Sequence, residues 1–140
     1  MSRENRALVL LVEDNPADVN LVREALSEAK VDCELRVVCN GASALELIEQ
    51  IERDEAQCPD LILLDLNLPR LDGEEVLKQL RSGGKCDSVK VLVATSSSAP
   101  GDRQRAIEMG ATDYFTKPSN LDQFLELGPK VRQMLGQPGS

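Results

Sequence analysis

The sequence predicts an α/β domain in which a parallel sheet is covered by helices. Two short apolar runs, Ala7–Val12 and Leu61–Leu64, end abruptly in acidic residues, and segments with helical spacing lie between such runs. Runs of this length are typical of strands buried on both faces. Glu13, Asp14 and Asp65 then lie where two strands leave the core, at the sheet edge where ligands bind in open α/β folds.

The other elements alternate along the chain. Asn15 and Pro16 suit the cap and first position of a helix, and Asn40-Gly41 opens a second one. The predicted order is a strand over 7–12, a helix from Pro16, an edge strand around 35–39, a helix from Gly41, a strand ending at Asp65, a helix from Gly73, a strand over 89–94, a short helix over 103–109, a strand over 112–116 and a last helix from near Asn120.

Gly128-Pro129 interrupts the apolar periodicity of the last helix. An interior proline costs about 3 kcal/mol and kinks or breaks a helix. We therefore expect a break or kink between residues 125 and 129.

Length and charge limit the function. At 140 residues the chain is expected to be one domain, 1–140, with its core at about 6–135. A net charge of −8 argues against nucleic-acid partners and anionic membranes, and no segment has a membrane span's apolar length or a signal peptide's apolar core. The domain is therefore expected to be cytoplasmic.

Residue types exclude further chemistry. The sequence holds no histidine, which removes Ser-His and Cys-His catalysis and phosphohistidine on this chain. The four cysteines show no CxxC spacing and are expected to be reduced, mostly buried thiols: Cys33, Cys39, Cys58 and Cys86.

Four of the predicted strands end in functional groups, namely Glu13-Asp14, Asp65, Thr95 and Lys117. Clustered carboxylates repel one another unless a cation lies among them, and hard oxygen ligands suit Mg²⁺ best. With a hydroxyl and an ammonium alongside, the set can bind a transferring phosphoryl group. Asp65 is the candidate nucleophile, because carboxylates form acyl phosphates.

The whole pattern resembles the receiver domain of two-component response regulators, over about residues 6 to 135. The matching residues are the acidic pair Glu13-Asp14, the phosphoacceptor Asp65, the hydroxyl of Thr95, the switch aromatic Tyr114 and Lys117-Pro118.

The resemblance implies a flavodoxin-like doubly wound fold with five parallel strands in order 2-1-3-4-5 and five helices. It implies that Asp14, Asp65 and the backbone carbonyl of Asn67 bind Mg²⁺, with Glu13 acting mainly through water. The phosphoryl donor would be a sensor histidine kinase or a histidine phosphotransfer protein, which agrees with the lack of histidine here.

It also implies a switch and a set of modulators. Phosphorylated Asp65 would draw in Thr95, and Tyr114 would fill the space, which biases a surface made by the fourth helix, fifth strand and fifth helix. In the family, the positions of Asn67 and Ser97 influence hydrolysis of the acyl phosphate, and a small residue such as Ser96 leaves access to the site.

The motif at 64–69 and the long connection after the second helix look similar to single-domain regulators associated with phytochrome-type histidine kinases. The chain ends after the receiver, so no DNA-binding or enzymatic output is expected. In that group, dimers often form through the last-helix face, so a homodimer is a possible state here.

Three alternatives are less well supported. A small aspartyl phosphatase of the haloacid dehalogenase type has an acid two residues after its nucleophile, where this chain has Asn67. A flavodoxin-like cofactor binder needs a phosphate-cradling loop where Glu13-Asp14-Asn15-Pro16 places negative charge. A phosphorylation-independent adaptor does not need the intact acid, hydroxyl and lysine set.

Overall fold

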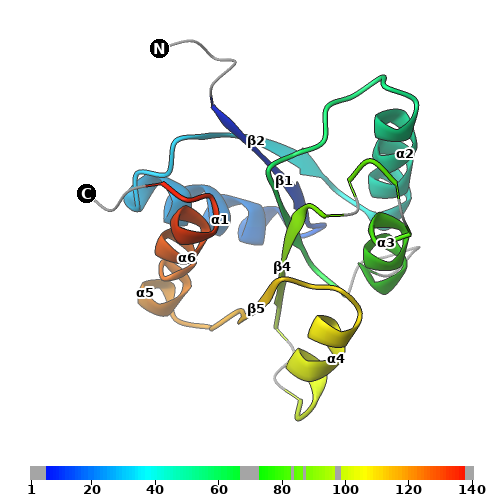
Figure 1. Cartoon of the computed structure of the whole chain (residues 1–140). Coiled ribbons are helices and arrows are strands. Elements are labelled where there is room, and N and C mark those ends of the chain that lie inside the picture. Colours follow the sequence, from blue (N-terminus) through cyan, green and yellow to red (C-terminus); the bar gives the residue numbers. More distant parts are fainter. Residues whose placement is uncertain (1–5, 67–72, 83, 87, 97–98, 138–140) are drawn as a thin grey trace.

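The computed structural model describes residues 6–66, 73–82, 84–86, 88–96 and 99–137. At its centre is a five-stranded sheet in which every pairing is parallel, in the order β2-β1-β3-β4-β5 (Figure 1). The strands are β1 (Ala7–Val12), β2 (Cys33–Val38), β3 (Leu61–Leu64), β4 (Lys90–Thr95) and β5 (Asp113–Thr116). The predicted fold class and strand order are confirmed.

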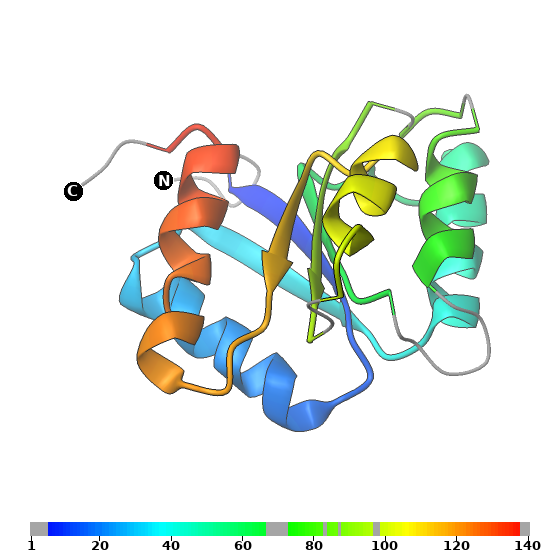
Figure 2. The ribbon, with the colours of Figure 1, turned by 90° about the horizontal axis from the view of Figure 1, so that it is seen from below.

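Helices cover both faces of the sheet, as the two views in Figures 1 and 2 show. They are α1 (Pro16–Glu28), α2 (Gly41–Glu52), α3 (Gly73–Leu80), α4 (Asp102–Glu108), α5 (Leu121–Phe124) and α6 (Leu127–Met134). The first, fifth and sixth helices lie on one face, and the second, third and fourth on the other. Each layer has its own buried apolar cluster, because alternate residues of the central strands point to opposite faces.

The register of the central strands positions the functional residues. Val12 of β1 pairs with Leu64 of β3, so Glu13 and Asp65 follow at matching positions. The ladder continues one step further, because the Asp65 amide donates to the Val12 carbonyl (3.2 Å). At the other side of β4, the Lys117 amide donates to the Thr95 carbonyl (2.8 Å). Strand pairing alone therefore brings these residues to one edge.

Asparagines cap three helices at the predicted positions. The side chains of Asn15, Asn40 and Asn120 accept hydrogen bonds from backbone amides in the first turns of α1, α2 and α5. Such caps satisfy amides that have no partner within the helix. Pro16 occupies the first turn of α1, where its missing N–H costs nothing.

The predicted break in the last helix is confirmed. α5 ends at Phe124 and α6 begins at Leu127, which places Pro129 in the first turn of α6, where a proline is tolerated. The presence of glycine at position 128 is explained by packing between helices. A Cβ atom at this position would lie 2.2 Å from the carbonyl oxygen of Ala25, so the glycine allows α6 to pack closely against α1.

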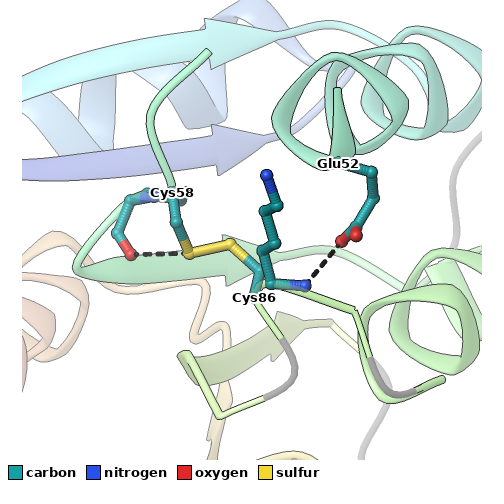
Figure 3. The surroundings of a disulfide bond; sticks show 5 residues. Glu52, Cys58 and Cys86 are labelled. Atoms are coloured by element: carbon teal, nitrogen blue, oxygen red, sulfur yellow. Dashed lines mark hydrogen bonds between the residues drawn. A yellow bond between two sulfur atoms is a disulfide. The ribbon is translucent and has the colours of Figure 1, made fainter. Parts of the chain in front are cut away.

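The prediction that all four cysteines are reduced, mostly buried thiols is wrong. Cys58 and Cys86 form a disulfide with a Cα–Cα distance of 5.8 Å (Figure 3). Cys33 and Cys39 are free, and of the four only Cys86 is fully buried. The paired cysteines precede β3 and β4, which are neighbours in the sheet, so the pairing follows from strand order and not from a sequence motif.

Among the described residues, no helix combines the length and apolar character that crossing a membrane requires.

Candidate functional site

Three carboxylates meet at the carboxyl ends of β1 and β3. One oxygen from each of Glu13, Asp14 and Asp65 lies within 4.8 Å of the others. Glu13 and Asp65 are buried, whereas Asp14 is exposed to solvent. Oxygen donors of this kind and spacing fit a hard divalent cation, which would relieve their mutual repulsion.

Lys117 reaches the same point from the end of β5. Its ammonium contacts Glu13 at 2.6 Å, Asp18 at 2.9 Å and Asp65 at 3.4 Å. The side chain of Lys117 is only 8% exposed. The predicted lysine and acids are therefore brought together, at sequence separations of up to 104 residues.

Asp18 is a residue that the sequence reading missed. It lies in the first turn of α1, three positions after the cap residue Asn15. An acid in a first turn is ordinarily explained by its favourable interaction with the helix dipole, so its residue type alone does not indicate a role in a site. The sequence nonetheless contains a signal, because α1 begins only one residue after the acidic pair, which places its first turn near the same end of the sheet.

The ion pairs and burial shift two pKa values in the site. Burial raises the pKa of Glu13 to about 7, although the nearby Lys117 ammonium opposes this shift. For Lys117, burial acts against the charged form, but hydrogen bonds to Glu13 and Asp18 outweigh it and raise the pKa to about 12. Lys117 therefore stays protonated at neutral pH, whereas the raised pKa of Glu13 lies close to neutral pH.

The site has more negative than positive groups. Three carboxyl groups, from Glu13, Asp18 and Asp65, contact the one ammonium, and the Asp14 carboxyl lies close to those of Glu13 and Asp65. The excess of acids favours binding of a cation with more than one charge.

The predicted hydroxyl and aromatic residues lie on the two strands next to β3 on this side of the sheet. Thr95 is the last residue of β4 and is 1% exposed, and Tyr114 is buried in β5 opposite Val93. Burial, with Asp102 nearby, raises the pKa of the Tyr114 hydroxyl. Ser96 is exposed, while Asn67 and Ser97 lie outside the described residues.

Residues 9–127 match the family model of the response regulator receiver domain. The chain belongs to this family. It is 36% identical to the response regulator Rcp1 of Synechocystis sp. over 121 residues, which cover 86% of this chain and 82% of Rcp1. It is also 36% identical to the response regulator MprA of Mycobacterium leprae, over 91% of this chain but 50% of that protein.

Solved structures agree with this assignment. The phosphorylated cyanobacterial phytochrome response regulator RcpA is 34% identical and superposes with a TM-score of 0.84, covering 96% of this chain and 97% of RcpA. The Mn²⁺-bound form of Rcp1 is 34% identical, with a TM-score of 0.80 over 91% and 92% of the two chains. The bacteriophytochrome response regulator RtBRR is 35% identical, with a TM-score of 0.76 over 96% and 81%.

The receiver is thus similar to phytochrome-associated single-domain response regulators. Receiver domains are phosphorylated by histidine kinases in two-component systems and bind a divalent metal ion, and the acidic cluster described above is the corresponding feature of this chain.

Proposed function

We propose that this receiver accepts a phosphoryl group on Asp65 in a Mg²⁺-dependent reaction and thereby switches a partner-binding surface. The observation that carries the proposal is the contact of the buried Lys117 ammonium with Asp65, at the point where Glu13 and Asp14 also converge. The donor is a sensor histidine kinase or a histidine phosphotransfer protein, because this chain has no histidine of its own.

In the transfer, one carboxylate oxygen of Asp65 forms a bond to phosphorus. The bond from phosphorus to the donor's histidine nitrogen breaks, and its electron pair stays on the imidazole. Lys117 keeps its proton throughout and faces oxygens of the phosphoryl group. Glu13, Asp14, Asp65 and the carbonyl of Asn67 would hold Mg²⁺, which when bound neutralises phosphoryl charge.

The switch role of Thr95 and Tyr114 is part of the proposal. Both side chains are buried on neighbouring strands, Thr95 at the end of β4 and Tyr114 within β5. A hydrogen bond from Thr95 to the phosphoryl group would alter the surface made by α4, β5 and the last helix, which the structure divides into α5 and α6. Ile107 of α4 and Leu121 of α5 are exposed apolar residues on these elements. Asn67, Ser96 and Ser97 are proposed to modulate hydrolysis of the acyl phosphate.

Likeness to RcpA and Rcp1 supports a phytochrome-type kinase as the donor. We propose a cytoplasmic signalling module without an enzymatic output, in which 1–140 act as one receiver and the α5–α6 face is available for a homodimer. An adaptor that works without phosphorylation is the main competing function, and a small aspartyl phosphatase is a weaker one.

The test is the intact mass of the protein after incubation with acetyl phosphate and Mg²⁺. We expect one phosphoryl group on the wild type and none on Asp65→Asn. Asp60→Asn is the matched control, because Asp60 directly precedes β3, at the opposite end of the strand that Asp65 follows. This control variant should be phosphorylated like the wild type.

No mass increase in the wild type, or an equal increase in Asp65→Asn, would contradict the proposal and favour an adaptor. Continuous release of inorganic phosphate from phosphate monoesters with many turnovers would favour the phosphatase.

A further inference from the structure

Lys117 has three N–H donors, and the structure shows how they are shared. Two contacts are short, to Glu13 at 2.6 Å and to Asp18 at 2.9 Å, and the third, to Asp65, is long at 3.4 Å. The two short contacts come from the two elements that flank one loop, since Glu13 directly follows β1 and Asp18 lies in the first turn of α1.

We propose that Asp18 is a positioning residue for phosphoryl transfer. Together with Glu13 it engages two donors of Lys117, so that the third donor is directed at Asp65 and at the phosphoryl oxygen that forms there. The inference rests on the proposed function and adds a residue of this chain to its site.

The long contact to Asp65 is the one that has to change during the reaction. When an oxygen of Asp65 binds phosphorus, its negative charge moves outward onto the phosphoryl oxygens, and the third donor of Lys117 can follow. The other two acceptors do not take part in bond formation. They can therefore hold the ammonium in place before and after transfer.

The backbone around Asp18 is fixed in position by the cap and the packing of α1. Asn15 caps α1 through the Ala17 amide (2.9 Å), and Pro16 restricts the backbone between them. Farther along, α1 packs closely on α6 at Ala25 and Gly128. The side chain of Asp18 is 24% exposed, so that it is partly shielded from water at the contact with Lys117.

A simpler explanation is that Asp18 stabilises only the helix, through its charge near the amino terminus of α1. The two explanations differ in what they need from the side chain. Helix stabilisation needs the negative charge, whereas positioning of Lys117 needs a hydrogen-bond acceptor. Asp18→Asn keeps an acceptor without the charge, and Asp18→Ala removes both.

The experiment measures the rate constant of phosphorylation by acetyl phosphate at saturating Mg²⁺, from intact mass against time, together with the Tm of each variant. Loss of a hydrogen bond to a charged group predicts a fall of about tenfold in the maximal rate for Asp18→Ala, with little change in half-saturating acetyl phosphate. Asp18→Asn should stay within about threefold of the wild type while its Tm falls with that of Asp18→Ala. Glu24→Ala, which removes an exposed acid from the same helix, should keep the wild-type rate.

An Asp18→Ala rate equal to or above that of the wild type would overturn the inference and leave the proposed function intact. Equal losses in Asp18→Asn and Asp18→Ala would also overturn it, because charge and not positioning would then be responsible. A wild type that takes up no phosphoryl group would instead reject the proposed function, and this inference with it.

Discussion

The two ends of the parallel sheet are organised in opposite ways. At the amino ends of the strands, Cys58 and Cys86 form a disulfide, and the Asp60 carboxylate accepts a hydrogen bond from the Leu8 amide (2.7 Å). Lys90 there donates to the Met134 carbonyl. At the carboxyl ends, several carboxyl groups crowd around Lys117.

This difference separates stability from function within one sheet. The amino end is joined by a covalent bond and by hydrogen bonds between groups of complementary type. The carboxyl end places like charges together, which opposes folding but creates a binding site for cations and phosphoryl groups. Substitutions at the amino ends should therefore change mainly stability, and substitutions at the carboxyl ends should also change phosphorylation.

Loss of the disulfide should have the largest effect on stability. The bond closes a loop with a sequence separation of 28 residues. Opening such a loop costs about 3–4 kcal/mol in the chain-entropy account. We expect the Cys58→Ser, Cys86→Ser double variant to lose about that much in urea unfolding, and to be phosphorylated normally when folded. The Cys33→Ser, Cys39→Ser variant is the control, because these cysteines are free. Equal stability of the two double variants would contradict the structural role.

Lys117→Met should disturb both stability and chemistry. It leaves the buried carboxyls of Glu13 and Asp65 without their ammonium, which for a buried pair costs about 3 kcal/mol. Urea unfolding at pH 8 measures this loss, and the mass assay should show little phosphorylation. Lys130→Met is a control, because Lys130 pairs with Asp113 outside the site. Normal phosphorylation of Lys117→Met would contradict the proposed role of Lys117 in phosphoryl transfer.

Glu13 should make stability depend on pH. Its pKa is raised from 4.5 to about 7 in the folded protein, so the folded state binds more protons than the unfolded state between these values. Its contribution to stability is thus full below pH 4.5 and is lost as the pH rises through about 7, by at most about 3 kcal/mol. The difference in unfolding free energy between wild type and Glu13→Gln, measured from pH 5 to 8 without Mg²⁺, isolates this effect. A difference that does not vary with pH would refute it.

Asp60→Ala should have the smallest effect. It removes the acceptor of the Leu8 amide at the start of β1, which costs about 1 kcal/mol for one exposed hydrogen bond. Asp60→Asn, which retains an acceptor, should lose less. Thermal unfolding distinguishes the two, and neither variant should alter phosphorylation. A slower phosphorylation rate in either would show that the two ends of the sheet are coupled.

Much of the fold was predictable because its signals are local. Leu61–Leu64 is apolar throughout and is buried throughout, and Asn15-Pro16 begins a helix. The break before Pro129 also follows from the chemistry of one residue. The parallel pairing of the strands then determines where the site lies. Parallel strands have their carboxyl ends on the same side of the sheet, so Glu13, Asp65 and Lys117 could be expected to lie close together.

Other features depend on contacts between distant segments. Three such contacts are the approach of Gly128 in α6 to Ala25 in α1, the disulfide between Cys58 and Cys86, and the ion pair of Asp18 with Lys117. They join residues that are 103, 28 and 99 positions apart, respectively. An acid in a first turn and a cysteine before a strand have ordinary local explanations. Periodicity in the sequence indicates which face of an element is buried, but not which side chains of other elements contact that face. Those contacts are determined only by the packing of the helices and the sheet in the tertiary structure.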